Sequence, residues 1–320
     1  MGLQMRMWTL VALMFAILYG IIVAIGAYTG AGNAYTYIIM AFVVVGLQYW
    51  FGPALVGLMM RVRYVSEEEE PELHRIVADL AAKAGIPKPR VGVSEISIPN
   101  AFAFGRSIRD GRVCITRGIQ RLLNGNELRA VLGHEMSHLK NRDMMIITFL
   151  SVIPLICYWA AWSLMFRRSR RDENGAALIG LGAFAMYFIS NLLVLYGSRI
   201  REYYADEGSV KLGNEPQYLA TALYKLVYGS ARLKNDPRGQ YELHQVQGVK
   251  AFFLNDVTNA SREIAELREI DQNYSGTIDR NELLALRSQT VRLSGSERMM
   301  EIFTTHPNML KRIRRLATFA

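Results

Sequence analysis

The sequence predicts a mainly helical α+β protein, with a small β-sheet and four transmembrane helices. Three observations support this fold class. The chain has 320 residues, of which 51% are hydrophobic, and a mean hydropathy of +0.11, yet 20% of its residues are charged. Uncharged stretches long enough to span a bilayer occur in two pairs. Polar helical and β-prone segments lie between and after these pairs, so a multi-pass membrane protein with a sizeable polar domain is expected.

The first pair of spans lies in residues 1–63, which we interpret as an N-terminal transmembrane hairpin. No charged residue occurs from Met7 to Met60, and a bilayer core requires about 20 apolar residues for each helix. The segment YTGAGNA (28–34) has the glycine and asparagine residues typical of a turn between two helices. A cleaved signal peptide is the alternative for the first span, but the apolar region is longer than such a peptide requires.

Residues 64–143 have the pattern of the first part of a polar domain. The segment 66–90 begins with acidic residues, has apolar side chains at helical spacing and ends with Gly85 before Pro87, so it predicts a soluble amphipathic helix. The β-prone runs RVGVSEI, NAFAFG and RVCITRG follow, separated by turn residues, and predict a small sheet. Another helix is expected to begin near Asn126.

Residues 144–198 contain the second uncharged pair, with candidate spans at 144–166 and 175–198. Pro154 can kink the first of these spans, because proline removes a helix hydrogen bond. Residues 199–320 return to polar helical sequence and are expected to form the second part of the polar domain. Two apolar hairpins are therefore interleaved with one domain that is assembled from separate pieces.

The positive charges favour a membrane surface as the partner over nucleic acid. The formal net charge is +9, and the arginines and lysines gather next to apolar spans and near the C-terminus, without the aromatic-interleaved groove of nucleic-acid binding. Arg6, Arg61 and Arg63 flank the first hairpin, so the positive-inside tendency places the polar domain in the cytoplasm. The second hairpin disagrees, because its turn, RRSRRDEN, holds four arginines. Cys114 and Cys157 provide no disulfide framework, which fits a reducing compartment.

The segment VLGHEMSHLKNRD (131–143) has the pattern of a metal site. His134 and His138 are four residues apart, so on a helix they lie on one face and can share a metal ion. Two imidazoles and a carboxylate, with one open position, suit Zn²⁺, which lowers the pKa of bound water toward about 7. Glu135 is one step round the helix, where it can activate this water as the base and pass the proton to a leaving amine.

A third ligand is expected from SRIREYYADEG (198–208), directly after the last apolar span. Glu202 can complete the coordination sphere, and Asp206 on the same helical face can accept a hydrogen bond from a ligand histidine and fix its tautomer. A solvated acidic helix face is the alternative. Because an apolar hairpin returns the chain to the side where it started, His138 and Glu202 are expected at the same membrane surface.

These residues resemble the HtpX heat-shock membrane metalloproteases, a family related to the CAAX prenyl endopeptidases. The similarity covers nearly the whole chain and rests on the two hairpins with NAFAFG, VLGHEMSHLKNRD, REYYAD and THPNMLKRIRRL, in this order. It implies a gluzincin-like zinc endopeptidase domain with His134, His138 and Glu202 as ligands of one Zn²⁺ and Glu135 as the catalytic base. It also implies a role in protein quality control under stress, in the cell membrane of a prokaryote, with the active site on the cytoplasmic side.

Three further positions follow from the resemblance. His306 and Arg312, in THPNMLKR, match family residues close to the active site, and both side chains can stabilise the oxyanion that forms when water adds to a peptide carbonyl. A role in capping a helix is the alternative for His306. Asn100, in PNAFAFG, matches a position on the edge strand beside the cleft, where it can bind the substrate backbone as an added strand pairs there. A role in a turn is the alternative for Asn100.

The segment DQNYSGTIDRNE (271–282) does not belong to this protease pattern. Gly276 permits a sharp turn, and the sequences on either side can form two helices, as in a calcium-binding EF-hand. EF-hands usually occur in pairs and the sequence contains one, so a polar turn or a loop without calcium is the alternative. The possible Ca²⁺ ligands, at loop positions 1, 3, 5, 7, 9 and 12, are Asp271, Asn273, Ser275, Thr277, Asp279 and Glu282.

Taken as a whole, the sequence favours a membrane-bound zinc metalloendopeptidase that hydrolyses peptide bonds of membrane or misfolded proteins. Its partners are the lipid bilayer and protein or peptide substrates, and the sequence implies no particular oligomeric state. A CAAX-type prenyl-protein endopeptidase is the enzymatic alternative, but it requires a larger membrane chamber than four spans can build. A non-catalytic, calcium-responsive membrane adaptor is the alternative from another class, although a scaffold has no need of Glu135. A channel or transporter is disfavoured, because the spans carry no charged residue that marks a pathway.

Overall fold

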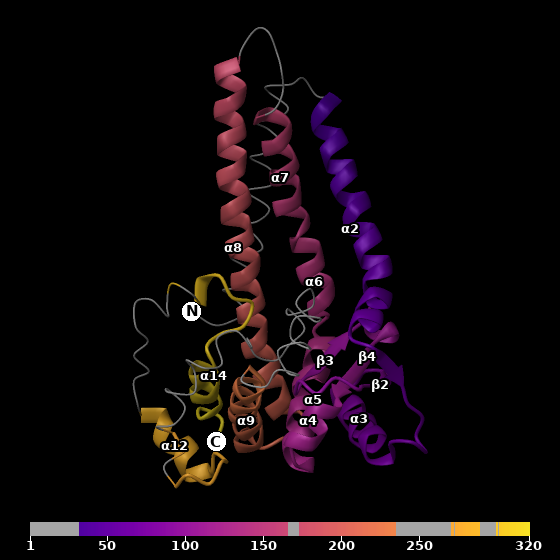
Figure 1. Ribbon diagram of the computed structural model, residues 1–320, viewed down its shortest axis with the longest axis vertical. Helices are drawn as coiled ribbons and strands as arrows, with labels where there is room; N and C mark the ends of the chain where they lie inside the picture. The colour runs from indigo at the N-terminus through magenta and orange to yellow at the C-terminus, as the bar shows by residue number, and fades with distance from the viewer. Residues whose placement is uncertain (1–31, 166–172, 235–269, 272, 289–298, 300) are drawn as a thin grey trace. The chain divides into compact units, whose positions relative to one another are not determined.

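The computed structural model describes residues 32–165, 173–234, 270–271, 273–288, 299 and 301–320 (Figure 1). The chain divides into two compact units. One comprises Met1–Gly52 and Met145–Ile200, and the other comprises Pro53–Met144 and Arg201–Ala320. Several sequence predictions lie outside the described residues. They are the first span with Arg6, most of the second hairpin's turn, and the helix before the EF-hand-like loop.

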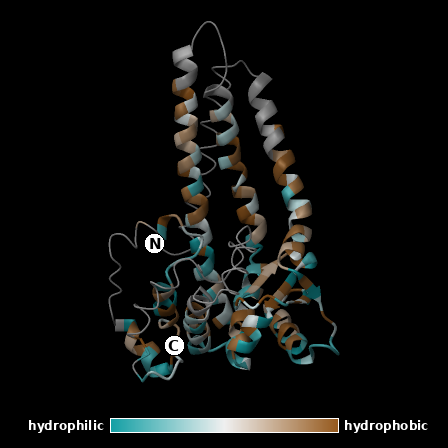
Figure 2. Ribbon diagram, viewed as in Figure 1, coloured by the Kyte–Doolittle hydropathy of each residue, from teal (hydrophilic) through white to brown (hydrophobic). Residues whose placement is uncertain are grey.

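Long apolar helices make up the first unit and extend into the second. They are α2 (Gly32–Met59), α6 (Asp143–Leu150), α7 (Val152–Met165) and α8 (Glu173–Lys211). Within the described residues, three segments are long and apolar enough to cross a membrane: Phe42–Met59, Asp143–Trp162 and Leu178–Lys211. Apolar residues predominate along these helices (Figure 2). They correspond to three of the four expected spans, and the remaining one lies outside the described residues.

The apolar segment after Asp143 is two helices, whereas the sequence predicted one span over 144–166. Helix α6 ends at Leu150 and α7 begins at Val152. Pro154 explains the interruption, because its ring clashes with the carbonyl of the residue four positions earlier, Leu150, in a continuous helix. The Ser151 hydroxyl and the Ser151 backbone N–H both donate to the Ile147 carbonyl, at 2.8 and 3.0 Å.

Helix α8 is continuous over 39 residues. Its first part is the apolar span that the sequence predicts at 175–198, and its last part is the polar segment with Glu202 and Asp206. No turn separates the two parts, so the candidate ligand Glu202 belongs to the same helix as the apolar span.

The second unit contains a four-stranded mixed sheet. Its strands are β1 (Val62–Tyr64), β2 (Arg90–Ser94), β3 (Ala101–Phe104) and β4 (Arg112–Thr116), in the order β1-β2-β4-β3. β2 and β4 are parallel, and the other two pairs are antiparallel. β3 is therefore an edge strand of this sheet.

Alternate residues of β3 pack on opposite faces of the sheet. Phe102 and Phe104 belong to a small cluster with Val56 and Met60 from the end of α2 and the residue that follows it. Ala101 and Ala103 belong to the main core of the unit. The small side chains on this face allow the helix α5 (Gly125–Lys140) to pack closely against the strand.

Helices complete the main core around α5. They are α3 (Pro71–Ala84), α4 (Arg117–Leu122), α9 (Pro216–Lys234), α12 (Arg280–Ser288) and α14 (Met309–Leu316). The short 3-10 helix η1 (Ile108–Asp110) connects β3 and β4 and has no buried residue. Gly85, directly after α3, caps the helix with φ of +69°, as the sequence predicts. Asn124 and Glu127 form a capping box that fixes the start of α5.

Small residues allow α5 and α8 to approach closely. A Cβ atom added at Gly208 of α8 would lie 2.5 Å from the Ser137 Cβ of α5 and would overlap the Ser137 hydroxyl. The next residue, Ser209, donates a hydrogen bond to the Ala130 carbonyl at 2.6 Å. The two helices that carry the metal-site motifs are therefore held at a short, fixed separation.

Gly208→Ala is expected to destabilise the protein by about 1–3 kcal/mol, because the added methyl group forces α8 away from α5. Denaturant unfolding measures this change. Adding Ser137→Gly removes the overlapping side chain and should recover most of the lost free energy. Gly57→Ala is the matched control, since a Cβ there meets no atom within 4 Å. Equal stability of Gly208→Ala and Gly57→Ala would contradict the close contact.

Candidate metal centre

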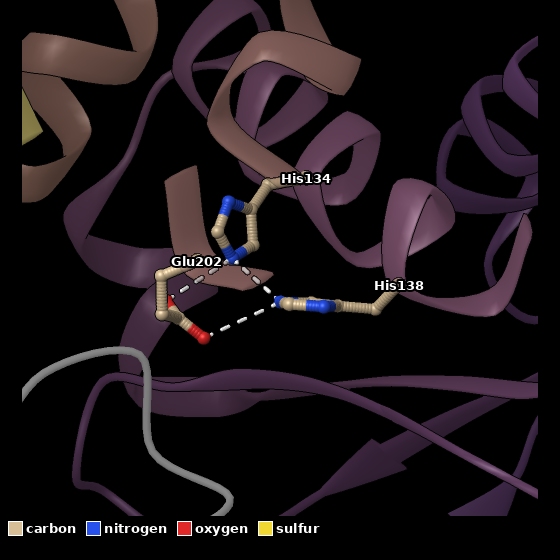
Figure 3. Close-up of side chains that lie close together, drawn as sticks. All are labelled: His134, His138 and Glu202. Carbon is tan, nitrogen blue, oxygen red and sulfur yellow. Dashed lines mark hydrogen bonds and ion pairs between the residues drawn. The ribbon is translucent and has the colours of Figure 1, made fainter. Parts of the chain in front are cut away.

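Two helices bring three candidate ligands together. His134 and His138 lie on one face of α5, and their Nε2 atoms are 3.0 Å apart. Glu202 of α8 faces both rings (Figure 3), with Oε2 at 3.6 Å from His134 Nε2 and Oε1 at 3.5 Å from His138 Nε2. These three residues form the one cluster of His, Cys, Asp or Glu side chains among the described residues that can hold a metal ion.

Two carboxylates determine which histidine nitrogens face the centre. His134 Nδ1 donates to Asp206 Oδ1 at 2.9 Å, and His138 Nδ1 donates to Asp143 Oδ2 at 2.6 Å. A carboxylate accepts, so this network assigns the Nδ1 protons. Each Nε2 then presents a lone pair to the centre, where a proton or a metal ion binds.

The donor set fits a tetrahedral zinc ion. Bonds of about 2.0–2.1 Å place neighbouring tetrahedral ligands about 3.3 Å apart. The two Nε2 atoms are 3.0 Å apart, and each has one of the two Glu202 oxygens at 3.5 or 3.6 Å. One ligand atom from each of the three residues lies within 4.8 Å of the other two. Glu202 Oε2 is buried without a hydrogen-bond partner among the described residues, although the Arg312 guanidinium and the His306 ring lie near it. Such an oxygen is suited to a metal ion.

Arg312 of α14 joins the acidic side chains behind the histidines. Its Nε and Nη2 donate to the two oxygens of Asp206 at 3.0 and 2.7 Å, and its Nη1 lies 3.1 Å from Glu202 Oε2. The guanidinium is fully buried. Asn308 caps the helix by accepting a hydrogen bond from the Leu310 N–H at 2.9 Å, which fixes the start of α14. Arg312 therefore contacts two carboxylates, and the oxyanion contact expected from the resemblance stays a prediction.

His306 also lies next to Glu202. Its Nδ1 is 3.2 Å from Glu202 Oε2, and its side chain is largely buried. Its Nε2 has no hydrogen-bond partner within the described part of the chain. The Asn308 side chain, and not His306, caps α14, which disfavours the helix-cap alternative for His306.

Glu135 lies beside the edge strand. It is 5% exposed, and its carboxylate accepts a hydrogen bond from the Ala103 backbone N–H. Burial raises the pKa of Glu135 to about 7. Burial also lowers the pKa of His134, which favours its neutral form. Burial opposes protonation of His138 too, but the hydrogen bond and charge of Glu202 outweigh it and raise the pKa of His138.

Asn100 lies immediately before the edge strand β3. Its backbone N–H donates to the Thr116 hydroxyl at 2.9 Å, and its carbonyl accepts from the Thr116 N–H at 2.9 Å. Asn100 is fully buried. The backbone contacts anchor the start of β3 to the end of β4, and the expected contact between Asn100 and a substrate stays a prediction.

The EF-hand-like loop is tied to helix α9. The Asp271 carboxylate accepts hydrogen bonds from the Ser275 and Gly276 N–H groups, each at 2.9 Å, and from the Tyr224 hydroxyl at 3.0 Å. Gly276 has φ of +76°, as the sharp turn requires. These contacts describe a well-formed turn, and nothing in them favours calcium over the alternative of a polar turn. Calcium binding therefore stays an untested hypothesis.

Sequence reasoning missed Asp143 and Arg201. Asp143 is five residues after His138 and belongs to the next helix, α6, so the rule that residues four apart share a helical face does not reach it. Arg201 adjoins Glu202 and forms an ion pair with Asp143. The sequence does place an aspartate, Asp143, at the end of VLGHEMSHLKNRD. Spacing alone does not identify it as a partner of His138, because their contact depends on the turn at 141–142.

The sequence model of peptidase family M48 matches residues 67–320. The chain belongs to this family. The M48 peptidase is 53% identical to the protein named Protease HtpX homolog of Methanothermobacter thermautotrophicus over 225 residues, covering 70% of this chain and 86% of the relative. It is 33% identical to Protease HtpX homolog 2 of Methanosarcina acetivorans over 321 residues, covering 99% and 95%. The resemblance predicted from the sequence is confirmed.

A solved structure shares the fold of this M48 peptidase. The crystal structure of S. mikatae Ste24p matches with a TM-score of 0.51 and 18% sequence identity. The match covers 98% of this chain and 65% of that chain. At this identity the likeness concerns the fold alone.

Arg312→Met is expected to destabilise the M48 peptidase by about 3–5 kcal/mol, because it leaves buried carboxylates without their counter-charge. Arg312→Lys keeps the charge but loses the two-pronged contact with Asp206, so an intermediate loss is expected. Unfolding of the metal-free protein in denaturant measures both. Arg315→Met is the control on the same helix, because Arg315 pairs with Glu207 at a partly exposed position. If Arg312→Met and Arg315→Met have the same free energy of unfolding, the buried pairing of Arg312 is dispensable for stability.

Proposed function

We propose that this M48 peptidase is a membrane-bound zinc metalloendopeptidase with His134, His138 and Glu202 as its metal ligands. The observation that carries the proposal is the convergence of two imidazole Nε2 atoms and one carboxylate, with both Nδ1 atoms engaged by other carboxylates. A bound Zn²⁺ supplies a Lewis acid that polarises the substrate carbonyl and lowers the pKa of water toward about 7.

Glu135 is the proposed base. It takes a proton from the attacking water and delivers it to the leaving amine. A base works best when its pKa is close to the pH of the reaction, and the pKa of Glu135 is about 7. The hydrogen bond from the Ala103 N–H holds the carboxylate at the edge strand, beside the place where the substrate is expected.

His306 and Arg312 have separate proposed roles. The buried Nε2 of His306 can donate to the oxygen on which negative charge develops during attack, since it has no partner among the described residues. The Arg312 guanidinium is engaged by Asp206 and Glu202, so it acts on the reaction by keeping these carboxylates in position. Asp206 in turn holds His134 with its Nε2 facing the metal.

The substrate is proposed to bind as an added strand along β3. An edge strand presents backbone groups that a peptide in extended conformation can pair with. The Glu135 carboxylate accepts a hydrogen bond from the Ala103 N–H of this strand. A peptide paired with β3 therefore lies next to the base. Asn100, at the start of the strand, is the proposed side-chain contact with the substrate backbone.

Membrane or misfolded proteins are the proposed substrates, in quality control at the cell membrane of a prokaryote. Three candidate spans support attachment to the bilayer, and the arginines that flank the first hairpin support a cytoplasmic active site. A CAAX-type prenyl-protein endopeptidase is the enzymatic alternative. The calcium-responsive adaptor has less support, because Glu135 is buried beside the ligand group, where an adaptor requires no acidic side chain.

Glu135→Gln is expected to lower the rate of casein cleavage by about 10²- to 10⁴-fold, since the amide cannot take up the proton. The zinc content of the purified protein, measured by elemental analysis, should stay at one ion per chain. Glu95→Gln serves as a control at an exposed glutamate. Undiminished cleavage by Glu135→Gln would remove Glu135 from the mechanism, and a wild-type protein that is inactive in the presence of zinc would favour the adaptor.

Glu202→Ala is expected to abolish both bound zinc and cleavage, because two imidazoles alone form an incomplete site. Chelation of the wild-type metal should give the same loss of activity, and adding Zn²⁺ should restore the wild type but not the variant. Glu207→Ala removes another glutamate of α8, outside the ligand group, and is the matched control. It should keep both zinc and cleavage. Full zinc content in Glu202→Ala would disprove its role as a ligand.

A further inference from the structure

We propose that Asp143 is a second positioning carboxylate of the metal centre, which fixes the ring of His138, and that Arg201 holds Asp143 in place. This inference rests on the proposed metal-dependent function. It assigns a role to two residues that are not ligands, Asp143 at the start of α6 and Arg201 directly before Glu202 on α8.

The contacts form a chain from one ligand helix to the other. His138 Nδ1 donates to Asp143 Oδ2 at 2.6 Å, and the other oxygen of Asp143 accepts from Arg201 Nη2. Arg201 also donates to the Asn141 carbonyl at 3.1 Å. Arg201 directly precedes the ligand Glu202 on α8. The Arg201–Asp143 pair therefore connects the helix of the third ligand to the ring of the second.

The turn between α5 and α6 is built so that Asp143 points back to His138. Arg142 has φ of +56°, in the left-handed region that residues other than glycine rarely adopt. The Arg142 N–H donates to the Leu139 carbonyl at 3.1 Å, and the Asn141 N–H donates to the Ser137 carbonyl at 2.9 Å. A continuous helix would place Asp143 on a different face from His138. The left-handed conformation of Arg142 therefore brings the two side chains into contact.

Asp143 acts on the ring and does not bind the metal. It contacts Nδ1, whereas the atom that faces Glu202 and His134 is Nε2 on the far side of the ring. The Asp143 side chain is 7% exposed and that of Arg201 is 8% exposed, so water competes weakly for their hydrogen bonds. His138 itself is 17% exposed, against 0% for His134. The ring that is more open to water thus has a carboxylate that fixes its tautomer.

The arrangement repeats the one at His134 with different residues. Asp206 accepts from His134 Nδ1 and is held by Arg312, as Asp143 accepts from His138 Nδ1 and is held by Arg201. Each ligand histidine therefore has its own aspartate, and each aspartate has its own arginine. A purely structural ion pair between α6 and α8 would not require the second oxygen of Asp143 to meet a ligand histidine.

The test compares Asp143→Asn with wild type in the purified full-length protein. The amide keeps the size of the side chain but can also donate, so it no longer selects the Nδ1–H tautomer of His138. Zinc affinity, from competition with a chelator, is expected to fall about 10- to 100-fold. We expect kcat to fall with KM nearly unchanged, and the visible spectrum of the Co²⁺-loaded protein to change. Asp143→Glu should recover part of the affinity.

Two control variants separate positioning from structure. Arg199→Gln, on α8 like Arg201, removes an arginine that lies over the Tyr196 ring. Asp79→Asn, on α3, removes the carboxylate that pairs with Arg129 of α5. Both should bind zinc as the wild type does. Arg201→Gln should weaken zinc binding, and because it leaves the buried Asp143 without its counter-charge it should also lower the unfolding temperature of the metal-free protein below that of these controls, so zinc affinity is measured well below that temperature.

Each outcome has a defined meaning. A folded Asp143→Asn that binds zinc within twofold of wild type, with the same Co²⁺ spectrum, overturns the inference while leaving the proposed function intact. If Asp143→Asn does not fold, Arg201→Gln decides, and wild-type zinc affinity in that variant overturns the inference. If the wild-type protein binds no zinc, the proposed function fails first and this inference fails with it.

Discussion

The buried guanidinium of Arg312 is the charge on which the geometry of the candidate metal centre depends. Asp206 is fully buried and Glu202 nearly so, and carboxylates in such a place are costly unless a cation compensates them. Arg312 contacts both, and it comes from the last described helix of the chain. The site is therefore complete only when the C-terminal segment has packed against α8. Secondary structure in α5 and α8 alone does not produce it.

The second constraint is the short separation of α5 and α8. Each helix contributes two polar residues one turn apart, and the pairs face each other: His134 meets Asp206, and His138 meets Glu202. Such a double pairing requires one helix register and one distance. The contact between Gly208 and Ser137 sets that distance, since any larger side chain at 208 would separate the helices. Close packing of the small residues Gly208 and Ser137 therefore sets the spacing of the ligands.

Sequence reasoning found what helical periodicity encodes and missed what turns and tertiary packing decide. His134, His138, Glu202 and Asp206 were available from spacing, because residues four apart share a face of a helix. Asp143 was not, because its contact with His138 depends on the left-handed turn at Arg142, which no propensity predicts. The interruption at Ser151 follows from Pro154, but its position one residue after Leu150 required the structure. The family resemblance located Arg312, whereas its engagement with two carboxylates depends on packing between distant segments.

Charge balance links these features to the kind of ion that the centre suits. Four acidic side chains surround the two histidines, namely Glu135, Asp143, Glu202 and Asp206, and two guanidiniums, of Arg201 and Arg312, compensate part of their charge. With neutral imidazoles and an ionised Glu135, these groups leave two negative charges in a largely buried volume. A divalent cation neutralises that excess, whereas a monovalent cation leaves half of it. In the metal-free protein burial raises the pKa of Glu135 to about 7, and the charge of Glu202 adds to this effect. The same burial that makes the excess charge costly therefore also prepares Glu135 to exchange a proton near neutral pH.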